Sequence, residues 1–177
     1  RKNRISYRLV KLDKEERMID LNKPQLLKGF NEVTKGNGYY KARLSTAASP
    51  KELMAGNYML RSISKAKNTD HVIYTMESFE QYPDLHYATL DFKKSIRLTH
   101  GIDQQKDYLW GTAELVSWIS LDGRKLEGVV YKPANFDPAK KYPMIVSFYE
   151  RNSETLFNYR MPEPHRSTID YHLYNSN

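Results

Sequence analysis

The feature that most constrains this chain is the stretch of residues 114–150, ELVSWISLDGRKLEGVVYKPANFDPAKKYPMIVSFYE. Apolar and polar residues alternate over residues 115–121 and again over residues 126–132, as expected for two half-buried strands. Asp122-Gly123 lies between the two runs, and Asp-Gly in that position is a strong signal of a tight β-hairpin. The sequence therefore predicts a two-stranded hairpin here.

The hairpin is followed by an unbroken apolar run, Met-Ile-Val-Ser-Phe, at residues 144–148. A strand without a polar face is typical of a sheet that is covered on both sides, as in α/β folds. The connecting loop contains Pro133 and Pro138, which restrict the backbone to extended or turn geometry. We therefore expect the hairpin to lead into a buried strand.

Several short motifs of this stretch resemble the prolyl oligopeptidase family of serine peptidases, in the branch that contains dipeptidyl peptidases and acylaminoacyl peptidases. They are Trp118-x-x-Leu-Asp-Gly, Leu126-Glu-Gly-Val-Val-Tyr-Lys-Pro, Asn135-Phe-Asp-Pro, Lys141-Tyr-Pro-Met-Ile-Val and Phe148-Tyr. The resemblance implies a chain that is mostly β with a little α. In it, residues 1–112 are the C-terminal part of a β-propeller, and residues 113–177 are the truncated N-terminal part of an α/β-hydrolase domain. This interpretation depends on burial of residues 144–148.

The region before the hairpin contains four strand-like runs joined by polar or proline-containing segments. These runs are residues 58–65, 71–77, 84–91 and 95–99. Their size and spacing match one blade of a propeller, and a generic antiparallel meander in a sandwich is the alternative from periodicity alone. The earlier runs, within residues 4–44, would belong to a preceding blade.

Within that N-terminal part, we expect a strand at residues 4–12 and a short return strand at residues 18–21. Residues 23–38 contain Pro24 and end in Gly-Asn-Gly, which favours loop and turn. A short strand is expected at residues 39–44, and residues 47–56 interrupt the pattern.

Near the C-terminus, Ser167 followed three residues later by Asp170 indicates a helix start of the capping-box type. Ile169 and Leu173 are spaced to bury one face of that helix.

No Gly-x-Ser-x-Gly motif occurs in the chain, so the nucleophilic elbow of a serine hydrolase of this fold is not among these residues. The histidines have no spacing typical of a metal site or of a base, and we expect them to be surface or structural side chains. They are His71, His86, His100, His165 and His172. The resemblance implies that the parent protein is a serine peptidase of the dipeptidyl peptidase or oligopeptidase type that works through an acyl-enzyme. Because the nucleophile, acid and base are not expected among these residues, we expect this chain to be inactive on its own, with no metal or cofactor.

The resemblance assigns one catalytic residue, Tyr149, as a donor in the oxyanion hole. A tyrosine hydroxyl is protonated near neutral pH and can donate a hydrogen bond to a developing oxyanion. From the residues alone, a tyrosine at the edge of a sheet is the alternative. The family usually has small residues next, whereas this chain has Glu150 and Arg151. A charged loop here could narrow the site, supply a salt-bridged wall or bind a peptide terminus, and the sequence does not choose among these. Substrate binding by Glu150 and Arg151, with Glu150 holding a peptide amine, is the hypothesis for this loop.

Composition limits the partners. The net charge of +7 comes from basic residues spread along the chain, which does not favour nucleic-acid binding, and no apolar run reaches the roughly 20 residues of a membrane span. Cysteine is absent, which excludes disulfides and thiolate metal sites. The missing initial methionine favours an internal segment.

The expected partners are a peptide substrate and the remainder of the propeller and hydrolase domains. A non-catalytic, propeller-like binding module is the alternative function.

Overall fold

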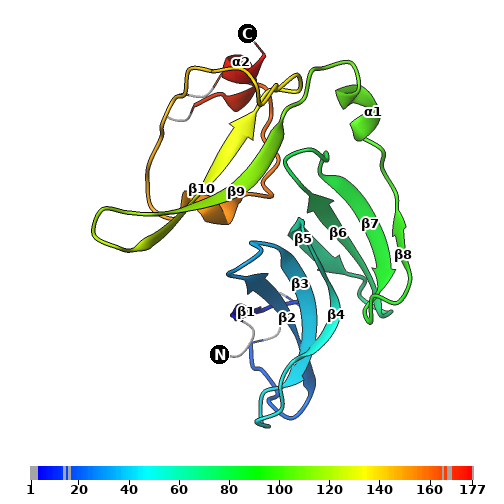
Figure 1. Ribbon diagram of the computed structural model, residues 1–177. Helices are drawn as coiled ribbons and strands as arrows, with labels where there is room; N and C mark the ends of the chain where they lie inside the picture. The colour runs from blue at the N-terminus through cyan, green and yellow to red at the C-terminus, as the bar shows by residue number, and fades with distance from the viewer. Residues whose placement is uncertain (1–3, 14, 16, 165, 167–168, 177) are drawn as a thin grey trace.

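The structure is a computed structural model that describes residues 4–13, 15, 17–164, 166 and 169–176 (Figure 1). These residues form two four-stranded antiparallel sheets, a two-stranded hairpin and three short helical segments. The prediction of a mostly β chain with a little α is therefore confirmed. The division into a propeller part and a hydrolase part stays a prediction.

Both four-stranded sheets are meanders, in which each strand pairs with the next one along the chain. The first sheet consists of β1 (Ile5–Leu9), β2 (Pro24–Asn31), β3 (Asn37–Arg43) and β4 (Lys51–Gly56). The second consists of β5 (Met59–Lys65), β6 (His71–Glu77), β7 (Asp84–Thr89) and β8 (Ser95–Arg97). We call these eight strands the two-sheet unit.

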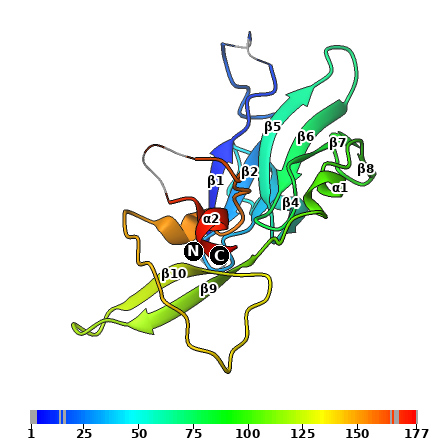
Figure 2. The same cartoon turned by 90° about the horizontal axis from the view of Figure 1, so that it is seen from above.

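The rest of the chain forms what we call the C-terminal unit, residues 112–176. Its strands are β9 (Thr112–Ile119) and β10 (Lys125–Lys132), and its helices are the 3-10 segment η1 (Asn152–Thr155) and α2 (Tyr171–Asn175). The helix α1 (Ile102–Gln105) lies in the connection between the two units. Figures 1 and 2 show the hairpin projecting away from the two sheets.

A single apolar core joins the two four-stranded sheets. Tyr39 of β3 is 1% exposed, and its ring stacks on Phe92 at 4.8 Å and meets Tyr74 edge-on at 6.0 Å. The other buried members of this core are Leu26, Leu60, Val72 and Ala88. Large rings that interlock in this way bury much apolar surface, which stabilises the pairing of the two sheets.

The strands of the second sheet follow the sequence prediction closely. β5, β6, β7 and β8 fall on the four predicted runs, because alternation of inward and outward residues is strong there. In β7, alternate residues are buried, and Ala88 of that set lies in the core.

The prediction for the N-terminal part is wrong at two strands. Residues 18–21 form no strand, and the partner of β1 is β2, in a region predicted to be loop; residues 51–56, predicted to interrupt the pattern, form β4. Pro24 is the first residue of β2, a position where its missing N–H disrupts no inner ladder bond. Gly29, within β2, lies against the Tyr40 ring, since a Cβ there would be 2.4 Å from it.

The predicted hairpin is confirmed. β9 and β10 pair from Lys125 opposite Ile119 to Lys132 opposite Thr112. Gly123 has φ +80°, a left-handed conformation that glycine adopts without the steric cost of a Cβ.

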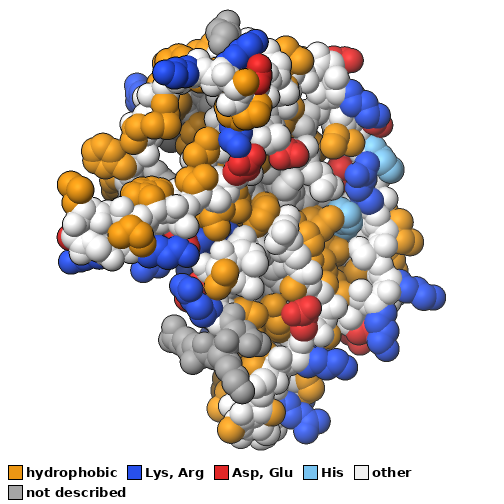
Figure 3. Space-filling view, viewed as in Figure 1, with side chains coloured by type: hydrophobic (Ala, Val, Ile, Leu, Met, Phe, Trp, Pro, Cys, Tyr) orange, Lys and Arg blue, Asp and Glu red, His pale blue; other side chains and the backbone are white. Residues whose placement is uncertain are grey.

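The predicted buried strand at residues 144–148 is wrong for this structure. All of residues 141–150 are exposed and none is in a strand; Met144 is 77% and Phe148 is 90% exposed. A buried strand needs neighbouring strands on its edges and cover on its faces, and no described strand lies beside this segment. We call residues 142–149 the apolar arm. Figure 2 shows the excursion that follows β10, and Figure 3 shows hydrophobic side chains gathered over the region of the hairpin and the arm.

The C-terminal helix also begins later than predicted. Asp170 is its N-cap, and its carboxylate accepts hydrogen bonds from the backbone N–H groups of His172 and Leu173. Ser167, the predicted cap, lies outside the described residues. Leu173 was expected to be buried but is 54% exposed, because a helix of five residues turns only part of its surface toward the hairpin. In the described chain, every helix is too short or too polar to cross a bilayer.

Candidate functional site

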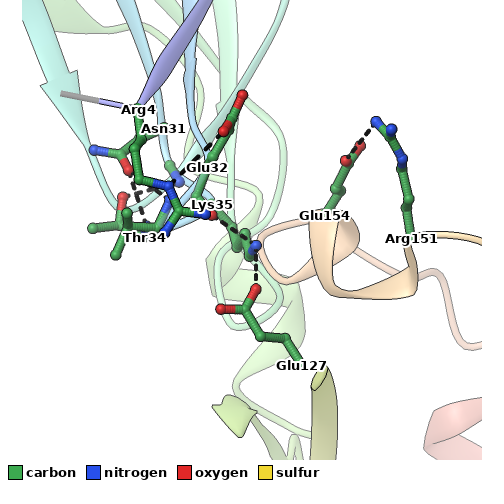
Figure 4. A network of polar contacts seen from close by, with 10 residues as sticks. Arg4, Asn31, Glu32, Thr34, Lys35, Glu127, Arg151 and Glu154 are labelled. Atoms are coloured by element: carbon green, nitrogen blue, oxygen red, sulfur yellow. Dashed lines mark hydrogen bonds and ion pairs between the residues drawn. The ribbon is translucent and has the colours of Figure 1, made fainter. Parts of the chain in front are cut away.

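The residues proposed from the sequence as a site lie where the apolar arm ends. Tyr149 is 86% exposed, and Glu150 is also exposed. Arg151 has φ 53°, in the left-handed region, and begins the 3-10 segment η1. Its guanidinium Nη1 lies 3.4 Å from the Glu154 carboxylate (Figure 4). The three side chains are therefore adjacent along the chain but do not enclose a pocket.

The described residues contain no complete catalytic group. No serine hydroxyl among them is hydrogen-bonded to a histidine, and they hold no cluster of three or more His, Asp or Glu side chains that would bind a metal. His71 and His100 are exposed, and His165 lies outside the described residues. The arrangement in this chain can donate a hydrogen bond from Tyr149 and present charge from Glu150, but it provides no nucleophile.

The C-terminal unit is attached to the second sheet through a cluster of rings that we call the aromatic joint: Phe79, Trp110, Tyr131, Tyr159 and His172. Phe79, in the loop between β6 and β7, is 2% exposed. Its ring lies 4.9 Å from Tyr131 and stacks on His172 at 5.4 Å, while its carbonyl oxygen accepts a hydrogen bond from the Trp110 indole at 2.7 Å. One side chain of the two-sheet unit thus occupies the core of the C-terminal unit.

His172 is held in this joint by packing on both sides. Its ring lies 4.0 Å from Trp110, and its Nε2 is 2.8 Å from the carbonyl oxygen of Arg160, which accepts a hydrogen bond from the imidazole. Burial lowers the pKa of His172 below its ordinary value, against the opposing effects of that carbonyl and of Asp170. A neutral imidazole in this place is a structural ring, as the sequence predicted for the histidines.

Glu77 adds a polar contact beside the joint. Its Oε1 accepts hydrogen bonds from the Arg61 guanidinium at 2.8 Å and from the backbone N–H of Tyr159 at 3.2 Å. Burial raises the pKa of the nearby Tyr159 phenol to about 12, with a further contribution from Tyr82. Next to the aromatic joint, the second sheet and the C-terminal unit are therefore joined by hydrogen bonds as well as by apolar contacts.

A second attachment lies at the other sheet. The turn between β2 and β3 presents Lys35, whose Nζ donates to the Glu127 carboxylate of β10 at 2.6 Å and to the carbonyl oxygen of Glu32 at 2.8 Å (Figure 4). The hydrogen bond from Lys35 lowers the pKa of Glu127. The two residues are 92 positions apart, and no local pattern in the sequence indicated that they meet.

Asp84 is a third polar group that the sequence patterns did not indicate. It is fully buried at the start of β7, where its Oδ1 accepts from the Thr99 hydroxyl at 2.8 Å and from the Gly101 N–H at 2.9 Å; its Oδ2 lies 3.6 Å from Arg97. Asp84 and His86 have the same parity as buried Ala88, a signal that would have placed them on the inner face. This network ties the end of β8 to β7 and has a structural role.

Comparison with known proteins finds matches among solved structures. No family model matches the chain, and no curated protein matches it. Among solved structures, it is similar to a serine-to-alanine variant of the AtxE2 isopeptidase with Astexin3-dC4 bound, with a TM-score of 0.45 and 12% identity over 80% of this chain. It is similar to the apo form of AtxE2 isopeptidase with a TM-score of 0.46 and 12% identity over 79% of the chain. The chain spans 26% of the length of each of these structures.

These comparisons correct the family predicted from the sequence motifs. The assignment to the prolyl oligopeptidase family is wrong, because no family model supports it and the two solved structures named above are those of an isopeptidase. The motifs that suggested it are short segments of β9, β10 and the loop after them, and hairpins with Asp-Gly turns and proline-rich loops occur in many folds. Similarity at this TM-score does not define the fold of the chain.

Proposed function

We propose that the chain is part of a peptide-cleaving hydrolase, a serine peptidase that works through an acyl-enzyme. In this proposal residues 1–112 belong to a β-propeller part and residues 113–177 to the start of an α/β-hydrolase part. The chain contributes Tyr149 as an oxyanion donor, whereas the nucleophile, acid and base come from another segment. The observation that carries the proposal is the apolar arm, which is extended, uncovered and ends at Tyr149.

The arm has the composition of a strand that is covered on both faces. In a strand, Met144, Ile145 and Val146 would point to alternating faces, and in this structure all three are more than half exposed. Within the described residues, the backbone groups of residues 143–149 have no backbone hydrogen-bond partner. Insertion between further strands would bury these side chains and pair these groups, which is a favourable change on both counts.

Insertion would also give Tyr149 a defined place. In α/β sheets, ligands bind beyond the carboxyl ends of the strands, and Tyr149 is the last residue of the arm. A strand fixed in a sheet would hold the phenol rigidly, as a preorganised donor to a tetrahedral intermediate requires. Exposure of the arm in this structure means that the peptidase proposal rests on this insertion and not on a sheet already formed.

The two-sheet unit supports the propeller part of the proposal. Two successive four-stranded meanders packed through one core have the organisation of adjacent blades. On the outer face of the second sheet, Ile73, Tyr87 and Ile96 lie opposite one another on three neighbouring strands, and Ile73 and Ile96 are 41% and 59% exposed. An apolar row of this kind suits a further sheet stacked on it.

Labelling with a fluorophosphonate tests the proposal directly. The intact protein is expected to form a covalent adduct on a serine that is not one of the serines of residues 1–177, located by mass spectrometry of peptides. This chain alone is expected to stay unlabelled and to cleave no peptide or ester. An intact, folded protein that resists the reagent while a known serine hydrolase reacts would overturn the proposal.

A non-catalytic binding module is the second candidate, and the uncovered arm favours it. Exposed apolar segments with free backbone groups commonly add to the sheet of a partner. The distinguishing result is an intact protein that binds peptides, measured by calorimetry, but is not labelled by the fluorophosphonate.

We expect replacement of Glu150 by glutamine in the intact protein to raise KM for peptides with a free N-terminus by about 10- to 100-fold, because a charge-assisted hydrogen bond to the substrate ammonium is weakened. Peptides with an acetylated N-terminus should show an unchanged KM. Glu15→Gln, at an exposed carboxylate in the first sheet's loop, is the control. Equal changes for free and acetylated peptides would exclude Glu150 as the amine anchor.

A further inference from the structure

Contacts to both sheets hold the C-terminal unit against the two-sheet unit. The aromatic joint connects it to the second sheet through Phe79. The ion pair between Lys35 and Glu127 connects it to the first sheet. Among the described elements, β10 packs mainly on β9, η1 and α2, and the ion pair links it to the turn between β2 and β3 of the first sheet.

The Lys35–Glu127 pair is shielded from solvent to an extent unusual for a lysine. The side chains are 7% and 26% exposed, whereas those of the Lys93–Asp91 pair are 81% and 47% exposed. A buried ammonium that lost its carboxylate would keep only the Glu32 carbonyl as acceptor, and an uncompensated buried charge is costly. The contact between the C-terminal unit and the first sheet therefore depends on the charges of both Lys35 and Glu127.

The turn that presents Lys35 is shaped to hold it there. Lys35 has φ 66°, a left-handed conformation that is strained for a residue with a Cβ. The turn is fixed by Asn31, whose carbonyl accepts from the Lys35 N–H at 2.8 Å and whose side chain accepts from the N–H groups of Val33 and Thr34 (Figure 4). Gly36 beside it admits no side chain, since a Cβ would lie 2.1 Å from the carbonyl oxygen of Gly56.

We infer that Lys35 and Glu127 form a latch that sets the angle between the two units, with the aromatic joint as its pivot. With the latch closed, the hairpin is held against the first sheet. With the latch broken, the C-terminal unit is still attached at Phe79 but turns away from the first sheet. This conformational role is independent of the peptidase proposal, because it concerns only residues of this chain.

Distance measurements between spin labels test the latch in the full chain. The chain has no cysteine, so labels can be placed at Ser45→Cys, in the exposed turn after β3, and at Leu121→Cys, at the exposed tip of the hairpin. The doubly labelled chain is expected to give one narrow distance distribution. Lys35→Met and Glu127→Gln should each add a second population at longer distance, and the charge-swapped chain carrying Lys35→Glu with Glu127→Lys should return to the single population.

The matched control is Lys132→Met, which removes an ion pair to Glu114 that lies within the hairpin and bridges no units. It should leave the distribution unchanged. The latch is excluded if Lys35→Met and Glu127→Gln give the unsubstituted distribution while circular dichroism shows a folded chain, or if Lys132→Met opens the molecule to the same extent. If Lys35→Met does not fold, the Glu127→Gln result alone decides, because that side chain keeps its shape and loses only its charge.

Discussion

Replacement of Tyr149 by phenylalanine in the intact protein is expected to lower kcat by about 100- to 1000-fold, the range found when one oxyanion donor is removed. The change deletes a single hydroxyl and keeps the ring, so substrate binding should be affected little and KM should stay within a factor of about two. Steady-state hydrolysis of peptide p-nitroanilides measures both constants.

Tyr108→Phe is the appropriate control for that experiment. Tyr108 is 65% exposed in the connection between the two units, and loss of its hydroxyl should leave kcat unchanged. Full turnover in Tyr149→Phe would remove Tyr149 from the oxyanion hole. That result would leave the fluorophosphonate test of the wider proposal standing, so the two conclusions can be separated.

The second large effect concerns the aromatic joint. Phe79→Ala is expected to lower the free energy of unfolding of this chain by about 3–5 kcal/mol, because the ring is almost fully buried and the small side chain leaves a cavity between Tyr131 and His172. Urea unfolding followed by circular dichroism gives the difference.

Phe148→Ala makes the same chemical change at a ring that is 90% exposed in the apolar arm. It should alter the free energy of unfolding of this chain by no more than about 0.5 kcal/mol. A loss as large as that of Phe79→Ala would show that the arm packs on the chain itself, which would contradict its exposed position.

The parts of the fold that the sequence predicted are those decided by local chemistry. Gly123 marks the turn of the hairpin, and strict alternation marks the strands of the second sheet, because both signals arise within a few residues. The helix near the C-terminus was predicted but misplaced, since Asp170 competes with an upstream serine as a cap and the local pattern does not choose between them.

The parts that the sequence did not predict depend on distant partners. β2 begins at Pro24 and is followed by Gly36-Asn37-Gly38, and these residues indicated a loop, whereas pairing with β1 and β3 makes the segment a strand. The arm has the pattern of a buried strand, but burial requires neighbours that the pattern cannot specify. Family motifs of a few residues were likewise insufficient to assign a family.

The candidate site shows the same division. Tyr149, Glu150 and Arg151 were located by their place after an apolar run, and their roles stay predictions. Lys35 and Glu127 lie on separate elements, and only folding brings the ammonium to the carboxylate. Asp84 was detectable in principle, because its parity in β7 places a carboxylate on the inner face of a strand.

The exposure of the apolar arm affects how easily the chain is degraded. An exposed segment whose backbone groups are not paired in the described structure is readily bound by proteolytic enzymes. We therefore expect proteolytic enzymes to cut this chain within residues 142–149, and any partner sheet that takes up the arm would at the same time protect it from degradation.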